Sequence, residues 1–212
     1  MEFRNKIIVS NKNDNKLNNK FYKVYDKNGK FKKIIDVRNE KNLTDEFLYV
    51  VTCFVINELG EVLIEVRSNN TELSPGQLDL VSGHVNGNET GFSAIVRELR
   101  EEVGIEEIDC NKLIRLTNKA KPMKFDNNGK TRNFHLDFFC LFTDSNTITK
   151  FQKEEINFIK WVPMELAFNM IKDGKTRFPK QEMGKVNYEA VFYQIRQRCK
   201  AKDLQESEVM EK

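Results

Sequence analysis

The stretch GHVNGNETGFSAIVRELREEVGI, from Gly83 to Ile105, fits the pattern G-x5-E-x7-R-E-U-x-E-E-x-G-U, in which U is an aliphatic residue. The nine specified positions are Gly83, Glu89, Arg97, Glu98, Leu99, Glu101, Glu102, Gly104 and Ile105. Seven of them demand a single residue type, so a match by chance somewhere in the chain has a probability on the order of one in ten million. The pattern is therefore a very specific signal.

Within this stretch, which we call the box, a loop precedes an amphipathic helix. Gly83 and Gly87 permit loop backbone that other residues would strain. Apolar residues recur at the three- and four-residue steps of a buried helix face, at Ala94, Ile95, Leu99 and Val103. Gly104 then supplies a helix stop.

The predicted helix carries three carboxylates on one side. Glu98 and Glu102 are four residues apart and Glu98 and Glu101 three apart, so these side chains are neighbours. They repel one another, and negative charge near the C-terminal end opposes the helix dipole. Arg97 and Arg100 supply part of the compensating charge, but hard divalent cations with oxygen ligands suit such a cluster better. We therefore expect Mg2+, or Mn2+ as a substitute.

A simpler interpretation of RELREE is a solvated helix face with paired arginine and glutamate side chains. However, Gly83 and Glu89 upstream and Gly104 and Ile105 downstream all stand in register with it. This wider agreement favours a chemical role for the carboxylates.

The complete pattern resembles the Nudix box, and residues 46–180 resemble the Nudix hydrolases of the MutT-like superfamily, which cleave nucleoside diphosphates linked to another moiety. The resemblance implies an α/β fold, an α/β/α sandwich with a mixed β-sheet. It assigns metal binding and water activation to Glu98, Glu101 and Glu102. It makes the backbone carbonyl of Gly83 a further metal ligand. Arg97 would orient the carboxylates and Glu89 would hold the loop to the helix, so both join the catalytic group.

A further acidic residue of this family often approaches the metals from a loop near the end of the domain. Glu154 and Glu155 lie at such a place, just before a strand centred on Trp161. They fit a solvated turn equally well, and Glu155 is the candidate metal ligand. A site of this kind positions a diphosphate, neutralises its charge and supplies a nucleophilic water near neutral pH, with a carboxylate taking the proton. We expect optimum activity at mildly alkaline pH.

Composition limits the other functions. At 212 residues and 39% hydrophobic, the chain suits one domain with extensions. Its longest apolar run, FLYVVTCFVI, is too short to span a bilayer. The net charge of +3 is mild, and no basic patch interleaved with aromatic residues predicts an obligate nucleic-acid partner.

The four cysteines, at positions 53, 110, 140 and 199, have no CxxC spacing, and only two histidines accompany them, so no zinc site is predicted. With no visible signal peptide, we expect a reducing, cytoplasmic setting and no membrane partner.

We expect an N-terminal extension over residues 1–45, a Nudix domain over 46–182, and a C-terminal helix with a charged tail over 183–212. FYKVYDKNGKFKKIIDV in the extension predicts a β-hairpin around Asn28 and Gly29. Dimers are common in the family, so this hairpin either joins two copies in a homodimer or extends the sheet of one.

Further strands are predicted for FLYVVTCFVI and EVLIEVR as a hairpin, for QLDLVSGHV as one strand leading to Gly83, for KLIRLTNKAKPMKF and NFHLDFFCLFT around the turn DNNG, and for FIKWV. PMELAFNMIKDG is predicted to be a helix that stops at Gly174, and VNYEAVFYQIRQRCK a final helix. The tail from Ala201 onward is expected to be disordered.

The hairpin and the stretch EVRSNNTELSPGQLDLVSGHV resemble the isopentenyl-diphosphate isomerase-like branch of the superfamily. True isomerases carry a catalytic cysteine before the Gly-His that opens the box, whereas this chain has Ser82, a much poorer proton donor. They also need several histidines, and only His84 lies at a matching place. An isomerase-like enzyme and a catalytically silent nucleotide sensor are the two alternatives to a hydrolase, and the intact box carboxylates argue against the silent sensor.

The expected partner is a small nucleoside diphosphate derivative, such as a nucleoside triphosphate, ADP-ribose, another nucleotide sugar or a dinucleotide cofactor. Substrate-binding candidates are Arg67 for a phosphate, Phe125 for stacking, and His84 beside the box. Lys119, Lys121 and Lys124 are further phosphate candidates, and Phe134 and Tyr49 further stacking candidates. Each of these residue types also serves commonly in cores or on surfaces.

Overall fold

The structure of the chain is a computed structural model. It describes residues 21–37, 39, 43, 45–71, 74–116, 121–127, 130–148, 150–178 and 188–210, without the side chains of 121–127, 130–132 and 202–210. Residues 1–20 of the expected N-terminal extension and the last two residues of the predicted turn DNNG lie outside this description.

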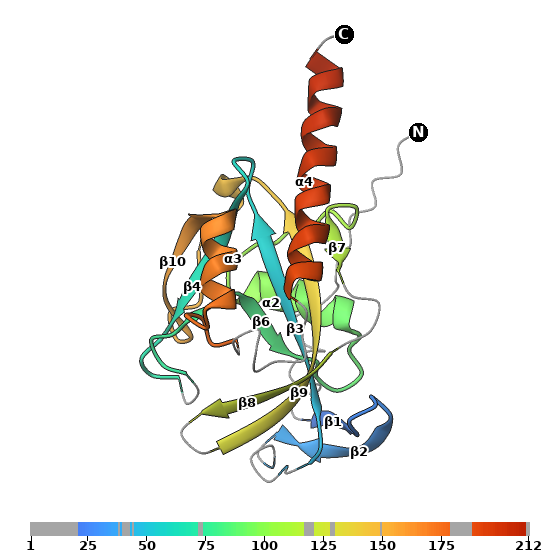
Figure 1. Cartoon of the computed structure of the whole chain (residues 1–212). Helices are drawn as coiled ribbons and strands as arrows, with labels where there is room; N and C mark the ends of the chain where they lie inside the picture. Colours follow the sequence, from blue (N-terminus) through green and yellow to red (C-terminus); the bar gives the residue numbers. More distant parts are fainter. Residues whose placement is uncertain are drawn as a thin grey trace.

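A mixed eight-stranded sheet forms the centre of the molecule (Figure 1). Its main path follows the order β10 (Ile156–Pro163), β4 (Glu61–Arg67), β3 (Leu48–Ile56), β9 (Lys130–Phe142) and β7 (Leu113–Arg115). The remaining strands β5 (Leu78–Asp79), β6 (Val81–His84) and β8 (Lys121–Asn127) pair with β4, β3 and β9. β3 and β9 run parallel over nine residue pairs, and the other pairs among the described strands are antiparallel.

Helices cover both faces of the sheet (Figure 1). They are α2 (Gly91–Glu101), α3 (Met164–Lys172) and α4 (Tyr188–Met210), with a short 3-10 turn at η2 (Ser145–Thr147). On one face Phe54 of β3 meets Phe168 of α3 and Phe192 of α4, at ring distances of 6.0 and 6.1 Å. On the other, Val55 joins the buried cluster that contains Leu99 of α2. Burial on both faces explains why β3 is largely apolar, and it confirms the predicted α/β/α sandwich.

The predicted hairpin of β3 and β4 is present, but the two strands separate after the pair Ile56 and Val62. Beyond this point β5 pairs with β4 and β6 pairs with β3. The prediction of a single strand over QLDLVSGHV is therefore wrong in detail, because the segment changes neighbour at the fully buried Leu80. The carboxylate of Asp79 accepts the N–H of Leu80 at 2.8 Å at this break.

The N-terminal hairpin consists of β1 (Phe21–Tyr25) and β2 (Phe31–Asp36), as predicted. It forms a sheet of its own at the lower edge of the molecule in Figure 1. Isolated bridges join Tyr22 to Asn86 and Tyr25 to Phe47, so the hairpin lies against the loop of the box and the start of β3.

The final helix is longer than predicted. α4 starts at Tyr188 and continues to Met210, so the expectation of disorder is wrong for residues 201–210. The segment AKDLQESEVM has no Gly or Pro and consists mostly of good helix formers, which favours continuation. The first turns bury Tyr188 and Phe192 in the core, while the end of the helix projects away from the sheet (Figure 1). None of the described helices is long and apolar enough to span a membrane.

Candidate active site

The box folds as the end of a strand, a loop and a helix. Gly87 in the loop has a left-handed φ of +47°. Thr90 caps α2: its side chain accepts the N–H of Ser93, and the Ser93 hydroxyl accepts the N–H of Thr90 at 2.9 Å. Such reciprocal capping satisfies backbone donors that the first turn leaves open. At the other end Gly104 has a φ of +67°, which confirms the predicted helix stop.

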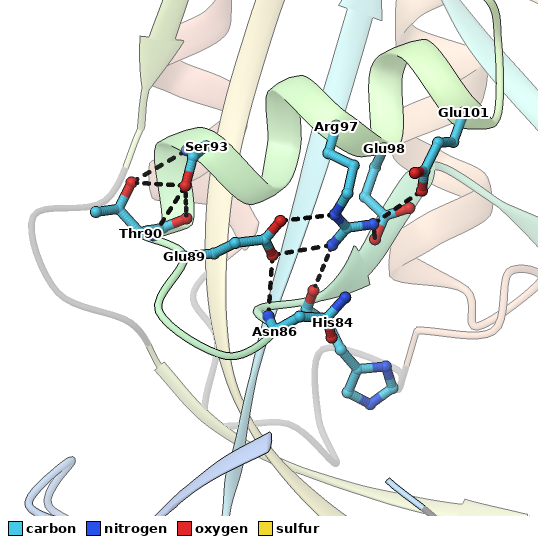
Figure 2. A network of polar contacts seen from close by, with 8 residues as sticks. All are labelled: His84, Asn86, Glu89, Thr90, Ser93, Arg97, Glu98 and Glu101. Carbon is cyan, nitrogen blue, oxygen red and sulfur yellow. Dashed lines mark hydrogen bonds and ion pairs between the residues drawn. The ribbon is translucent and has the colours of Figure 1, made fainter. Parts of the chain in front are cut away.

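Arg97 joins the loop to the helix (Figure 2). Its Nε and Nη2 donate to the two carboxylate oxygens of Glu89 at 2.8 and 3.1 Å. Its Nη1 donates to Glu98 at 2.6 Å and to Glu101 at 3.0 Å. Its Nη2 also donates to the carbonyl oxygen of His84 at 2.9 Å. One guanidinium thus holds the loop and two of the carboxylates in fixed relation.

Glu98 is buried against Gly83. A Cβ atom at position 83 would lie 1.7 Å from Oε1 of Glu98, which no side chain tolerates. Gly83 lies in β6, opposite Val51 of β3, rather than in a loop. The expected reason for this glycine, strained loop backbone, is therefore wrong; the close approach of Glu98 requires it. Burial raises the pKa of Glu98 to about 7, against the opposing effect of Arg97.

Glu102 lies deeper than Glu98, with 4% of its surface exposed. Its Oε2 accepts the N–H of Ser82 at 2.9 Å. Burial, with the charges of Glu65, Glu98 and Asp79 in addition, raises its pKa well above the usual range. The backbone N–H of Ser82 opposes this rise. Glu102 therefore belongs to a buried group of mutually repelling carboxylates.

Two members of this group, Glu65 of β4 and Asp79 of β5, were not among the predicted site residues. They lie opposite each other in the β4 and β5 ladder and are almost fully buried. Oε1 of Glu65 has no hydrogen-bond partner within the described residues. A sequence signal for Glu65 existed, since it shares one face of the strand EVLIEVR with the fully buried Leu63.

Two arginines oppose these carboxylates. Nη1 of Arg67 lies 3.2 Å from Oδ2 of Asp79, so this predicted phosphate ligand pairs with a protein carboxylate. Nε of Arg177 lies 2.8 Å from the same oxygen. Arg177 follows α3, more than seventy residues after the box by number, and no motif in the sequence marked it.

Glu101 and Glu155 occupy the outer side of the site. The Glu101 side chain is 43% exposed. Glu155 is exposed in the turn before β10, where its Oε1 accepts from Nε2 of Gln152 at 3.2 Å. The negative charge of Glu155 contributes to the raised pKa of Glu98, which places it near the carboxylate group. Gln152 attaches this turn to the helix end by donating its N–H to the carbonyl of Glu102 at 2.9 Å.

The other two predicted substrate-binding residues, His84 and Phe125, lie on β6 and β8. The His84 ring stacks on Tyr22 of the hairpin, with centroids 4.7 Å apart, and meets Phe134 edge-on at 5.5 Å. Figure 2 shows this ring pointing away from Arg97. Phe125 lies in β8, and its side chain is outside the described part.

The donor chemistry of the site fits a hard divalent cation. Every ligand candidate, Glu98, Glu101, Glu102, Glu155 and the carbonyl of Gly83, offers oxygen, as Mg2+ and Mn2+ prefer. The buried oxygen of Glu65 and the excess of carboxylates over guanidinium groups also call for positive charge. Among the described residues, no three acidic, histidine or cysteine side chains already converge as a metal site.

Comparison with known proteins identifies the family of the chain. Residues 46–182 match the NUDIX domain family. The chain is 27% identical over 187 residues to Nudix hydrolase 3 of Arabidopsis thaliana, covering 84% of this chain but only 23% of that protein. It is 30% identical over 116 residues to the uncharacterized Nudix hydrolase all7351 of Nostoc sp., covering 53% of this chain and 68% of that protein.

Solved structures share the fold. The DR0079 protein of Deinococcus radiodurans superposes with a TM-score of 0.54 at 23% identity, over 74% of this chain and 91% of that one. A MutT protein of Methanosarcina mazei Go1 gives a TM-score of 0.50 at 22% identity, over 73% and 96%. The chain therefore belongs to the NUDIX domain family and has the fold of the MutT-like proteins.

Proposed function

We propose that this chain is a divalent-metal-dependent pyrophosphohydrolase that cleaves the diphosphate linkage of a nucleoside diphosphate derivative. Nudix hydrolases are pyrophosphohydrolases that generally use divalent metals, and the box is intact in this member of the family. One observation carries the proposal: Glu98 is buried directly against Gly83, while Arg97 fixes it beside Glu101. A merely solvated helix face would not bury carboxylates in this way.

The proposed roles follow from this placement. The carboxylates of Glu98, Glu101, Glu102 and Glu155 and the carbonyl of Gly83 would hold Mg2+, for which Mn2+ substitutes. A cation held there would neutralise the charge of the diphosphate and would lower the pKa of water enough to supply a nucleophile near neutral pH. Arg97 and Glu89 keep the carboxylates in place, and a carboxylate of this group accepts the proton of the attacking water. His84, Arg67 and Phe125 remain the substrate-side candidates.

Release of product from a panel of diphosphates tests the proposal. The panel contains nucleoside triphosphates, ADP-ribose, other nucleotide sugars and dinucleotide cofactors, each assayed with Mg2+, with Mn2+ and with EDTA. We expect turnover of at least one compound, its loss in EDTA, and a fall of at least about 100-fold in Glu98→Gln. Glu106→Gln, which changes an exposed glutamate paired with Lys150, is the matched control and should keep full activity. Turnover that persists in EDTA would contradict the proposal.

The isomerase alternative loses support from the position of Ser82. Its hydroxyl accepts a hydrogen bond from Nη2 of Arg177 at 2.7 Å, and the residue is 6% exposed. The four cysteines, all within the described part of the chain, form no disulfide, which suits the reducing, cytoplasmic setting that we propose.

A further inference from the structure

Arg177 reaches the box from a distant part of the chain. Its segment is attached to β5, because its backbone N–H donates to the carbonyl of Leu78 at 2.9 Å and Thr176 forms a bridge with the same residue. Its side chain is 17% exposed. Nε of the guanidinium lies 2.8 Å from Oδ2 of Asp79 in an ion pair, and Nη2 donates a hydrogen bond to the hydroxyl of Ser82 at 2.7 Å.

Ser82 connects this guanidinium to a box carboxylate. Its Oγ accepts from Arg177, and its backbone N–H donates to Oε2 of Glu102 at 2.9 Å. The next residue along β6 is Gly83, whose carbonyl is a proposed metal ligand. Two hydrogen bonds, one to the hydroxyl and one from the backbone N–H of the buried Ser82, therefore connect Arg177 with Glu102.

Glu102 needs such support. It lies at the C-cap of α2 among Glu65, Glu98 and Asp79, whose negative charges repel it. Without a fixed donor on the opposite side, its carboxylate would turn away from these neighbours. Groups that orient a metal-binding side chain commonly matter nearly as much as the ligand itself.

We propose that Arg177 is a positioning residue, which acts through Ser82 to hold Glu102 and the Gly83 backbone in the geometry that binds the divalent ion. The inference rests on the proposed metal site and adds to it a residue outside the box. In this proposal Arg177 acts on the ion only through Ser82.

Removal of the Arg177 side chain changes the Mg2+ affinity in opposite directions depending on whether the arginine acts through its charge or as a positioning residue. Removing a cation from the neighbourhood of a divalent site tightens the binding of the ion by simple electrostatics. Removing a positioning residue weakens it, by about 10-fold when the orienting contact is lost. We therefore expect weaker Mg2+ binding in Arg177→Gln despite the lost positive charge, and an equal loss in Ser82→Ala, which changes no charge.

Isothermal titration calorimetry of the full chain with Mg2+ alone, and with Mn2+ alone, measures these affinities without any substrate. Thermal melts in EDTA show that each variant is folded. Arg196→Gln is the control that removes the same charge from a different ion pair, the one that Arg196 makes with the exposed Glu165 between α3 and α4, and it should bind Mg2+ as the wild type does. If Arg177→Gln does not fold, the Mg2+ affinity of Ser82→Ala still tests the proposal.

The double variant Arg177→Gln with Ser82→Ala shows whether the two residues act on Mg2+ affinity through the same hydrogen bonds or independently of each other. Because both residues act through one set of hydrogen bonds, the double variant should lose no more than about 10-fold, as either single variant does. Losses that multiply in the double variant would overturn the inference. So would wild-type or tighter Mg2+ binding in both single variants. A wild-type chain that binds neither ion would instead overturn the proposed function itself.

Discussion

Gly83 and Glu98 are in such close contact that a methyl group at position 83 would overlap the carboxylate, with Cβ only 1.7 Å from Oε1. The substitution Gly83→Ala must therefore displace Glu98. A displacement of about 1 Å in a catalytic constellation commonly costs on the order of 100-fold in rate, so we expect at least that loss in kcat/KM. Gly60→Ala is a useful comparison, because no atom lies within 4 Å of its added Cβ but its φ is +72°. That variant should have a lower Tm than the wild type but the same kcat/KM.

Arg97→Lys should lower both stability and activity. Lysine keeps the charge but cannot serve Glu89, Glu98 and the His84 carbonyl together, as the guanidinium does. We expect a loss of about 2 kcal/mol in the free energy of unfolding, measured by urea denaturation, because hydrogen bonds to buried charges are lost. Arg100→Lys, on the same helix but with an exposed contact to the Glu106 carbonyl, should change little. Equal stability of the two variants would contradict the bridging role of Arg97.

Glu102→Gln should stabilise the metal-free protein at alkaline pH. Burial raises the pKa of Glu102 in the folded state above its unfolded value. Its contribution to stability is therefore fully present below the unfolded pKa and is lost as pH rises through the folded pKa. Glutamine avoids this loss and can still accept the Ser82 N–H. In EDTA we expect a higher Tm than the wild type at pH 8 and little difference at pH 4.

The same variant should lose the stabilisation that the divalent ion provides. Binding to the folded state alone raises the Tm, so Mg2+ should raise the Tm of the wild type and have a much smaller effect on Glu102→Gln. An equal rise in both proteins would show that Glu102 is not part of the metal site.

Ser82→Cys should not create an isomerase. The hydroxyl of Ser82 accepts a hydrogen bond from Arg177, and the residue is buried beside Glu102. We expect no detectable conversion of isopentenyl diphosphate by this variant and weaker Mg2+ binding, because sulfur is a poorer hydrogen-bond acceptor than oxygen. Substantial isomerase activity would show that the site retains that chemistry.

Arg196→Gln should affect stability slightly and activity not at all. Arg196 makes two hydrogen bonds with Glu165, at 2.7 and 2.8 Å, which join α4 to α3. The bond to Arg196 lowers the pKa of Glu165, so the stabilisation is present above the unfolded pKa and is lost as pH falls. Since the Glu165 side chain is 64% exposed, the loss at pH 7 should stay below about 1 kcal/mol. A melt at pH 7 and pH 3 should show the difference between the two proteins shrinking at the lower pH.

Turns and helix ends were predictable from the sequence where the residues of a short segment determine them. Gly104 ends the box helix through its left-handed backbone, and Asn28 with Gly29 forms the hairpin turn. The break at Leu80 was not predictable, because an apolar run is equally compatible with one strand or two. The segment forms β5 and β6 with different neighbours because β3 and β4 diverge, and this divergence is a property of the folded sheet. Helix formation beyond Ala201 was not predictable either, because a highly charged segment is compatible with both a disordered tail and a solvated helix.

The box pattern alone determined the family and which carboxylates form the metal-binding candidates, because residue identity and helical spacing are properties of a short segment. The tertiary structure decided which other side chains surround these carboxylates and oppose their charge. It buried Glu65 and Asp79 beside Glu102, brought Arg177 to Ser82 across ninety-five positions, and set Glu98 against Gly83. Burial and long-range pairing depend on how the whole chain packs, and no short segment contains that information.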